Sequence, residues 1–477
     1  MTKRRTSWKH GIQRNKRHTD PNHRGLGDID RRGFLRNMMV LGGGLTSFAG
    51  VGPFKHLGYA DALPSGEPRF YVFAYFGGGW DVLLGLDPRD PRRFNQDNVA
   101  TTRIMPGYDL LGASGLDLIT TDSGIELGPY IGELADQIDK LCIVRGMSME
   151  TLTHAVGRRR FLTGKAPAGL AARGSSAATW LASQLGVTEP IANLAVNVES
   201  YNRDQPTYAS ALSVDSVPDL IEVLRSANPQ LAQYEAAALN DLLSGAADCD
   251  QALGSSMWQA AEEARQRADF TVASGFSDLF EFGAGTEEME GIRDHYGIGT
   301  DMRSPEAQAA MAGQSLMAGI TRVVSFQAAS GLDTHFDNWI DEQGPRQQRG
   351  FNAVARLAAD LEAHEYLDTG KSWLDHTTIV GFSEFSRTPM LNSSDGRDHA
   401  LMNSCFLMGG NVRGGQVIGE STNIGMGPTA VHLPTGAVSV GGDVIRPEHI
   451  IQSLFADAGM TGDPADLRVD PLGGIFF

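Results

Sequence analysis

Short apolar segments recur along the chain from residue 70 to residue 408 and alternate with stretches of helical spacing. Each segment is four to seven residues long and apolar almost throughout. This pattern is typical of strands in a parallel sheet that helices cover on both faces. The predicted strands are Phe70–Phe76, Leu141–Val144, Leu194–Val198, Val323–Ala328, Thr377–Phe382 and Cys405–Met408.

Helical periodicity accounts for much of the remaining chain. Residues 351–364 carry apolar side chains at positions 351, 354, 357, 358 and 361, which form one face of a helix. Residues 447–458 predict a second helix, and the Ala-, Leu-, Glu- and Gln-rich residues 216–296 predict a helical insertion that caps the sheet. The glycine-dense residues 408–440 predict loops and short hairpins. The predicted fold is therefore α/β, with a largely parallel sheet sandwiched between helices and a helical insertion.

The first 62 residues predict a twin-arginine signal peptide. Arg31-Arg32 precede Phe34-Leu35, and an uncharged run from Met38 to Gly52 leads to Ala60-Asp61-Ala62, a site for signal peptidase. A membrane or amphipathic helix is the alternative, but the uncharged run is shorter than the roughly 20 apolar residues that a membrane span needs. We therefore expect a mature chain, residues 63–477, that is periplasmic or secreted, has no transmembrane anchor and meets the twin-arginine translocase during export.

Removal of the leader makes the remaining chain strongly acidic. Residues 1–62 contain 12 of the 40 Lys and Arg residues and 4 of the 57 Asp and Glu residues, so residues 63–477 carry a net charge of −25. This charge argues against nucleic acid or an anionic membrane surface as a partner. The three cysteines, Cys142, Cys249 and Cys405, are widely separated and odd in number, which does not predict a disulfide framework.

Glycines and polar residues follow the first two predicted strands. Phe70–Phe76 runs into Gly77-Gly78-Gly79-Trp80-Asp81, where Asp81 either projects a carboxylate from the end of the strand or caps the next element. Thr153, His154 and an arginine block that begins at Arg158 follow Leu141–Val144. The arginines either bind an anionic group, which guanidinium matches well, or form a solvated helix face.

Carboxylates and imidazoles follow the later strands. Asp333 and His335 come after Val323–Ala328, and their spacing of two can direct both side chains at one ion when the backbone is extended. Glu384 and Arg387 follow Thr377–Phe382, and Asp398-His399 come one loop later. Mixed oxygen and nitrogen ligands suit zinc or manganese, and sites dominated by carboxylates suit calcium or magnesium. We expect a divalent metal that supports hydrolysis of an anionic ester.

These motifs, in this order, resemble the exported bacterial proteins of the DUF1501 family, in the alkaline phosphatase and sulfatase-like superfamily. The matching stretches are Arg31–Leu35, Phe76–Asp81, Thr153-His154, Leu162–Gly164, Asp333–His335, Ser383–Pro389 and Gly396–His399. The resemblance implies an alkaline phosphatase-like fold with a metal-supported ester hydrolase site at the strand ends.

The same resemblance implies roles for individual residues. The implied metal ligands are Asp81, Asp333, His335, Glu384, Asp398 and His399. Thr153 is the implied nucleophile, and His154 with Arg158 or Arg387 is expected to orient the anion. Three residues depart from the expected pattern: Phe385 replaces a phosphatase histidine, no cysteine precedes Leu162-Thr163-Gly164, and Ser386 replaces a glycine.

The leading hypothesis from the sequence is an exported, metal-dependent hydrolase of phosphate or sulfate esters. Its expected partner is an anionic ester substrate, with a glycan or an envelope component as the candidate. A non-catalytic envelope protein of the same fold that binds a glycan or a protein is the alternative, motivated by Phe385 and by the missing sulfatase cysteine. A metal-dependent mutase or transferase is a third possibility.

Overall fold

The computed structural model describes residues 67–111, 117–169, 171–225 and 256–477, together with residues 234, 235, 238 and 241. All of them belong to one compact unit of the chain, Ala49–Phe477. The predicted signal peptide, residues 1–62, and Cys249 lie outside the described residues.

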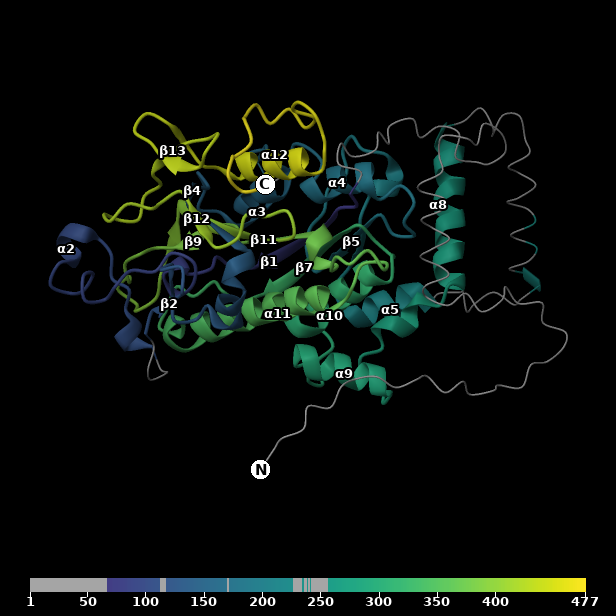
Figure 1. Cartoon of the computed structure of the whole chain (residues 1–477), viewed down its shortest axis with the longest axis horizontal. Coiled ribbons are helices and arrows are strands. Elements are labelled where there is room, and N and C mark those ends of the chain that lie inside the picture. Colours follow the sequence, from purple (N-terminus) through teal and green to yellow (C-terminus); the bar gives the residue numbers. More distant parts are fainter. Residues whose placement is uncertain are drawn as a thin grey trace. The chain divides into compact units, whose positions relative to one another are not determined.

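An eight-stranded sheet forms the centre of this unit (Figure 1). Seven strands run in one direction, because every pairing is parallel except the two that β11 makes, with β4 and with β8. The carboxyl ends of the seven strands therefore share one edge of the sheet. In spatial order the strands are β12 (Gln416–Ile418), β4 (Leu141–Ser148), β11 (Met402–Gly409), β8 (Thr377–Phe382), β1 (Phe70–Phe76), β7 (Val323–Ala329), β5 (Asn193–Val196) and β6 (Leu212–Val214).

The apolar pattern locates the main strands closely. β1 and β8 have the predicted bounds, and β7 is one residue longer than predicted. The direction of β11 differs from the predicted parallel arrangement. Residues 383–401, which connect β8 to β11, do not cross back over the sheet, so β11 starts at the edge where β8 ends and must run antiparallel to it. Apolar character alone carries no information about strand direction.

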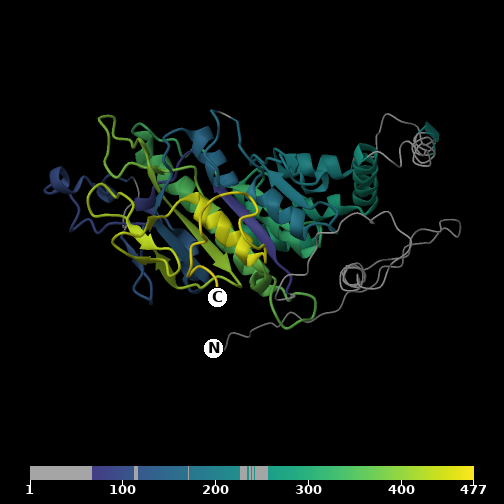
Figure 2. The same cartoon turned by 90° about the horizontal axis from the view of Figure 1, so that it is seen from above.

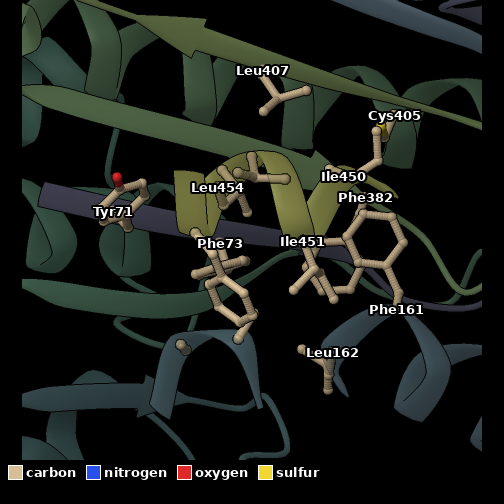
Figure 3. Close-up of a cluster of buried hydrophobic side chains, with 14 of the residues drawn as sticks. Tyr71, Phe73, Phe161, Leu162, Phe382, Cys405, Leu407, Ile450, Ile451 and Leu454 are labelled. Atoms are coloured by element: carbon tan, nitrogen blue, oxygen red, sulfur yellow. The ribbon is translucent and has the colours of Figure 1, made fainter. Parts of the chain in front are cut away.

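One face of the sheet is covered by α3 (His154–Thr163), α4 (Ala177–Leu185) and α12 (Pro447–Asp457). Alternate side chains of β1, including Tyr71 and Phe73, belong to the same buried cluster as residues of these helices (Figure 3). Within it, Phe161 stacks on Phe382 with ring centroids 4.3 Å apart. Burial of this apolar face fixes α3, and with it His154, against the sheet.

The other face is covered by α10 (Pro305–Met317) and α11 (Gly344–Ala363) (Figures 1 and 2). Phe76 of β1 contacts Phe351 of α11, with ring centroids 4.9 Å apart. The helix predicted at residues 351–364 is α11. It begins seven residues before the predicted start and ends one residue before the predicted end. The expected α/β fold, a mostly parallel sheet between helices, is the fold observed.

Residues 216–296 contain helices in the part that the structure describes. They are α5 (Val217–Arg225), α8 (Ser256–Ala273), the 3-10 helix η5 (Phe276–Phe280) and α9 (Glu287–Tyr296). Further short elements include α2 (Val99–Thr102), β2 (Ile119–Thr120), β3 (Glu126–Leu127), η7 (Leu374–His376), β9 (Ser386–Arg387), β10 (His399–Ala400), β13 (Ala430–His432), β14 (Ala437–Val438) and β15 (Asp443–Val444). Among the described helices, none combines the length and apolar character needed to cross a membrane.

Candidate metal centre

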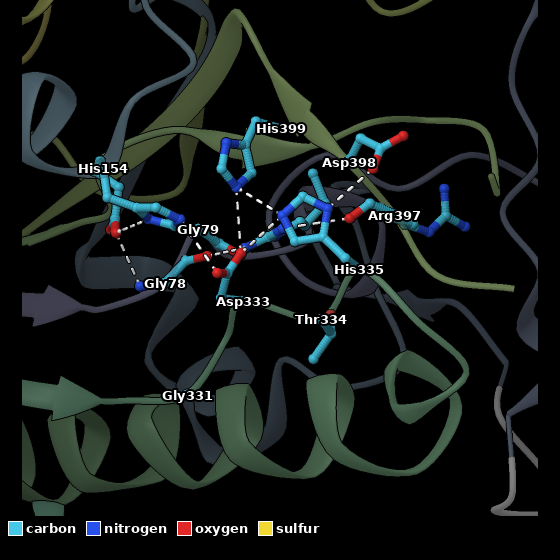
Figure 4. A network of polar contacts seen from close by, with 12 residues as sticks. Gly78, Gly79, His154, Gly331, Asp333, Thr334, His335, Arg397, Asp398 and His399 are labelled. Atoms are coloured by element: carbon cyan, nitrogen blue, oxygen red, sulfur yellow. Dashed lines mark hydrogen bonds and ion pairs between the residues drawn. The ribbon is translucent and has the colours of Figure 1, made fainter. Parts of the chain in front are cut away.

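Three histidines and one aspartate meet at the edge of the sheet where the strands end (Figure 4). His154 opens α3 after β4, Asp333 and His335 follow β7, and His399 lies in β10 just before β11. Three sequence-distant segments therefore bring these four side chains together, because parallel strands share one carboxyl edge.

The Nε2 atoms of the three histidines surround the Asp333 carboxylate. Nε2 of His335 and of His399 lie 3.1 and 3.2 Å from Asp333 Oδ1, and Nε2 of His154 lies 3.4 Å from Oδ2. The Nε2 atoms of His335 and His399 are 2.9 Å apart. Ligand atoms about 2.0–2.1 Å from one zinc ion, at angles of about 90–110°, are separated by about 2.9–3.4 Å. The ligand atoms of His154, Asp333 and His399 all lie within 4.8 Å of one another, a spacing that suits a single metal ion, and His335 Nε2 lies beside those of Asp333 and His399.

Each histidine is oriented by an oxygen acceptor at its other ring nitrogen. Nδ1 of His154 lies 2.8 Å from Glu384 Oε1, Nδ1 of His335 lies 2.9 Å from Asp398 Oδ1, and Nδ1 of His399 lies 2.7 Å from the Leu152 carbonyl. A carbonyl or carboxylate oxygen accepts a hydrogen bond, so each Nδ1 carries a proton, and Nε2 is the nitrogen of each ring that remains to bind a metal at the cluster. Such outer partners are typical of histidines that bind a metal.

The Asp333 carboxylate stays ionised at every ordinary pH. Partial burial raises its pKa, but the hydrogen bond and the positive charge of Arg387 oppose burial, and the pKa is lowered to about 2. Burial lowers the pKa of His399, which keeps this imidazole neutral. A neutral imidazole and an ionised carboxylate are the forms that bind a metal.

Glu384 and Asp398 lie behind the histidines rather than among the converging donors. Burial raises the pKa of Glu384, but the hydrogen bonds from His154 and from the Gly78 backbone N–H, 3.0 Å from Oε1, hold it below its usual value. The hydrogen bond from His335 holds the pKa of Asp398 low in the same way. Both carboxylates were predicted as metal ligands, and the structure instead places them as hydrogen-bond partners that orient His154 and His335.

Asp81 lies apart from this cluster, contrary to its predicted place in the metal site. Its Oδ2 accepts a hydrogen bond from Trp339 Nε1 at 2.9 Å and lies 3.0 Å from Nε of the fully buried Arg397. Its Oδ1 accepts from the backbone N–H of Leu83 at 3.0 Å, which caps the short helix η1 (Val82–Leu84). Both oxygens are thus engaged in a buried ion pair and a helix cap, the capping alternative that the sequence left open.

Arg387 holds the loops of the site together. Its buried guanidinium donates to Asp333 Oδ1 at 2.6 Å, to the Gly79 carbonyl at 3.0 Å and to the Gly78 carbonyl. It also donates to the Arg397 carbonyl at 3.2 Å. With these acceptors engaged, Arg387 positions Asp333, and the anion-orienting role predicted for it has no direct support in its contacts.

A cleft of about 860 Å³ extends from the cluster across the ends of β1, β7, β5 and β6. His154, Asp333 and Glu384 line one end of it, and Arg158 lies one helical turn beyond His154 on α3. Arg158 donates to Glu199 Oε1 at 2.7 Å. Thr153 is exposed at the N-terminal boundary of α3, and its side chain does not cap the helix.

A family model described as "Protein of unknown function (DUF1501)" matches residues 72–435. The chain belongs to the DUF1501 family. The match covers most of the chain and confirms the resemblance inferred from the motifs. No protein with a curated description matches the sequence.

Solved structures similar to this DUF1501 chain include a protein in the alkaline phosphatase superfamily from Vibrio parahaemolyticus, with a TM-score of 0.38 and 8% identity over 84% of this chain and 69% of that one. Ps i-CgsB matches with a TM-score of 0.37 and 9% identity over 85% of this chain and 75% of that one. The PsFucS1 sulfatase from Pseudoalteromonas sp. matches with a TM-score of 0.33 and 10% identity over 86% of this chain and 73% of that one.

Several parts of the DUF1501 site gave no signal in the sequence. The Leu152 carbonyl orients His399 through a backbone atom, which no side-chain pattern can reveal. Arg397 was noticed only as a part of its motif, and its partner Asp81 is more than 300 residues away. Phe385 is buried and packs its ring 4.8 Å from that of His154 and 4.3 Å from that of His399. Phe385, which replaces a phosphatase histidine in the resemblance, therefore packs beside the imidazoles.

Proposed function

We propose that this protein is an exported, metal-dependent hydrolase of phosphate or sulfate esters. The observation that carries the proposal is the convergence of three imidazole Nε2 atoms on one ionised carboxylate, with every Nδ1 held by an acceptor. Unpaired lone pairs facing one another are costly unless a cation lies between them. The cleft beside the cluster gives a substrate access to it.

The donor set favours zinc among the metals considered. His154, His335, His399 and Asp333 would hold the ion, and three imidazoles with one carboxylate suit zinc better than calcium or magnesium, which prefer oxygen ligands. A bound zinc ion supplies positive charge at a transferring phosphoryl or sulfuryl group and a lowered pKa to water.

The chain's own residues supply the remaining functions in this proposal. Arg158 faces the cleft one turn from His154 and binds the non-bridging oxygens of the ester, which guanidinium groups match well. Arg387 keeps Asp333 ionised and in place. Thr153 is our candidate for the attacking hydroxyl, because it is exposed and directly precedes His154.

A non-catalytic binding protein is the second candidate. In the described part of the chain, no hydroxyl or thiol is hydrogen-bonded to any of the three histidines. A metal-supported binder of a glycan or a protein needs no such pair, whereas an activated hydroxyl nucleophile ordinarily has a base beside it.

Hydrolysis of an aryl phosphate and an aryl sulfate tests the proposal. Purified residues 63–477 should turn over at least one of the two, and Asp333→Asn should lower kcat/KM by at least about a hundredfold, since even outer partners of a metal ligand are worth about 10–100-fold. Asp337→Asn, an exposed carboxylate four residues further along the same loop, is the matched control and should retain full activity. Thr153→Val should abolish turnover without loss of metal.

Metal-loaded protein that hydrolyses neither aryl ester nor any member of a broader ester panel would contradict the hydrolase and favour the binding protein. Equal activity of Asp333→Asn and Asp337→Asn would show that the cluster takes no part in the hydrolysis.

A further inference from the structure

The cleft is much larger than a transferring phosphoryl or sulfuryl group needs. Its volume of about 860 Å³ lies in the range of about 300–1,000 Å³ that is typical of sites for whole small molecules. The end away from the histidines lies over the carboxyl ends of β5, β6 and β7. That end is therefore available for the alcohol part of the ester.

Two side-chain amides mark this distal end. Asn197, directly after β5, donates from Nδ2 to Oε1 of Gln327 in β7. The remaining amide groups, Asn197 Oδ1 and Gln327 Nε2, make no hydrogen bond with another described residue and belong to the cleft lining. Whichever way the two amides are oriented, the pair offers at least one donor and one acceptor side by side.

The backbone at Asn197 fixes the position of this amide. Asn197 has a φ of 55°, in the left-handed region, which asparagine adopts more readily than most residues other than glycine. Its N–H donates to the Val214 carbonyl at 2.9 Å, which fixes this conformation between the ends of β5 and β6. Asn197 is exposed at this turn and belongs to the cleft lining.

The surrounding lining disfavours a second anionic group. The side chains of Tyr75, Val198 and Val214 are at least about nine-tenths buried, whereas Tyr201 is partly exposed in the cleft. Ser213 and Asp215, both exposed after or within β6, add a hydroxyl and a carboxylate. The carboxylate opposes a second anionic group at this end.

Groups that both donate and accept fit this lining best. A hydroxyl group does both, and two neighbouring hydroxyls match the donor and acceptor of the amide pair together with the acceptor of Asp215. We propose that the distal end of the cleft is a binding site for a polyhydroxylated alcohol, in which Asn197 and Gln327 recognise neighbouring hydroxyl groups. As a site for the leaving alcohol, this inference rests on the proposed hydrolase function.

The contacts connect this site directly to the cluster. A side chain added at Gly77 would come within 2.8 Å of Gln327 Nε2, so Gln327 packs on the backbone next to Gly78. Gly78 N–H in turn binds Glu384, which orients His154. A sugar ester could thus place its hydroxyls at the amides while its anionic group lies beside His154 and Arg158.

Esters that share an anion and differ in the alcohol test this inference. The probes are glucose 6-sulfate and glucose 6-phosphate, each compared with the corresponding butyl ester. The wild-type protein should prefer the sugar ester at least tenfold in kcat/KM. Asn197→Gly removes the amide at a position whose φ suits glycine, and Gln327→Met removes the other amide at nearly constant size. Each should lower kcat/KM on the sugar ester roughly three- to tenfold, the value of one neutral hydrogen bond, and leave the butyl ester within twofold.

No preference for the sugar ester in the wild type, or equal losses on both esters in the variants, would overturn the polyol site while leaving the hydrolase intact. If no ester turns over, the hydrolase proposal fails separately, and calorimetric titration with free glucose then decides the polyol site. Binding that is weakened in Asn197→Gly supports the site, and absence of binding to the wild type overturns it.

Discussion

The Nε2 atoms of His335 and His399 lie 2.9 Å apart, although the Nδ1 proton of each ring is donated to an oxygen acceptor. Two neutral imidazoles held in this way have no proton to place between them, so their lone pairs repel. The outer hydrogen bonds nevertheless hold the two Nε2 atoms close together. A cation at the two Nε2 atoms resolves the conflict, and the first two predictions derive from that arrangement and from the Asp81–Arg397 ion pair.

Asp81→Asn should separate the structural role of Asp81 from the role of a metal ligand. The substitution leaves Arg397 buried without its countercharge, and breaking such a pair costs about 3–5 kcal/mol of unfolding free energy. Metal content should stay at the wild-type value, because Asp81 does not face the histidines. Chemical denaturation and elemental analysis measure the two quantities. A stable variant that has lost its metal would show that Asp81 is a ligand after all.

Asp398→Asn should weaken metal binding without abolishing it. The amide oxygen of asparagine can still accept a hydrogen bond from His335 Nδ1. The substitution removes the negative charge that raises the basicity of the ring, and loss of such an outer partner typically lowers metal affinity about 10–100-fold. Competition with a chelator measures the change. Asp395→Asn is the matched control, since Asp395 is exposed in the same loop and its φ of 57° suits asparagine. Equal affinities of the two variants would contradict the role of Asp398.

The stability of the protein should fall in mild acid because of His376, which directly precedes β8 and so lies at the opposite end of that strand from the cluster. Burial lowers the pKa of His376 below its usual 6.5, against the opposing effect of Glu67. The folded state therefore binds fewer protons than the unfolded chain, and the contribution of the neutral ring is complete above pH 6.5 and lost as the pH falls toward the lower folded value. Urea unfolding at pH 7.5 and pH 5.5 measures this slope.

His376→Phe should flatten the slope, because the aromatic contact with Tyr366, whose ring lies 4.5 Å away, can be kept without a titrating group. His432→Phe, at an exposed position, is the control and should leave the slope unchanged. An unaltered slope in His376→Phe would assign the acid sensitivity to other groups.

The sequence predicted the strands and the edge where the site lies, because both depend on local patterns. Phe70–Phe76 is apolar at every position as a doubly covered strand must be, and polar residues at its carboxyl end belong to the shared edge. Asp333 and His335 were close enough in sequence to be recognised as a pair, and the structure brings both to the cluster. His399 was predicted as a third ligand from the Gly396–His399 motif.

The sequence could not predict which polar residues face the cluster and which orient its histidines, because each role depends on the residue's neighbours in the folded chain. Glu384 and Asp333 are both carboxylates at strand ends, yet the Gly78 N–H and His154 engage Glu384, while Asp333 faces three imidazoles. His154 was expected to orient the substrate, and the register of α3 instead directs its Nε2 at Asp333. Asp81 forms an ion pair with the buried Arg397, and no sequence motif links the two residues.

Elemental analysis of residues 63–477, produced through the native export signal, tests the central claim most directly. The account predicts about one divalent metal ion per chain, absent from His399→Ala and Asp333→Asn and retained in the exposed-site control His432→Ala. It also predicts that a chelator lowers the Tm of the wild type, since a ligand at 100 times its Kd adds about 2.7 kcal/mol to the free energy of unfolding. Metal-free wild-type protein whose Tm neither zinc nor chelator changes would contradict the account.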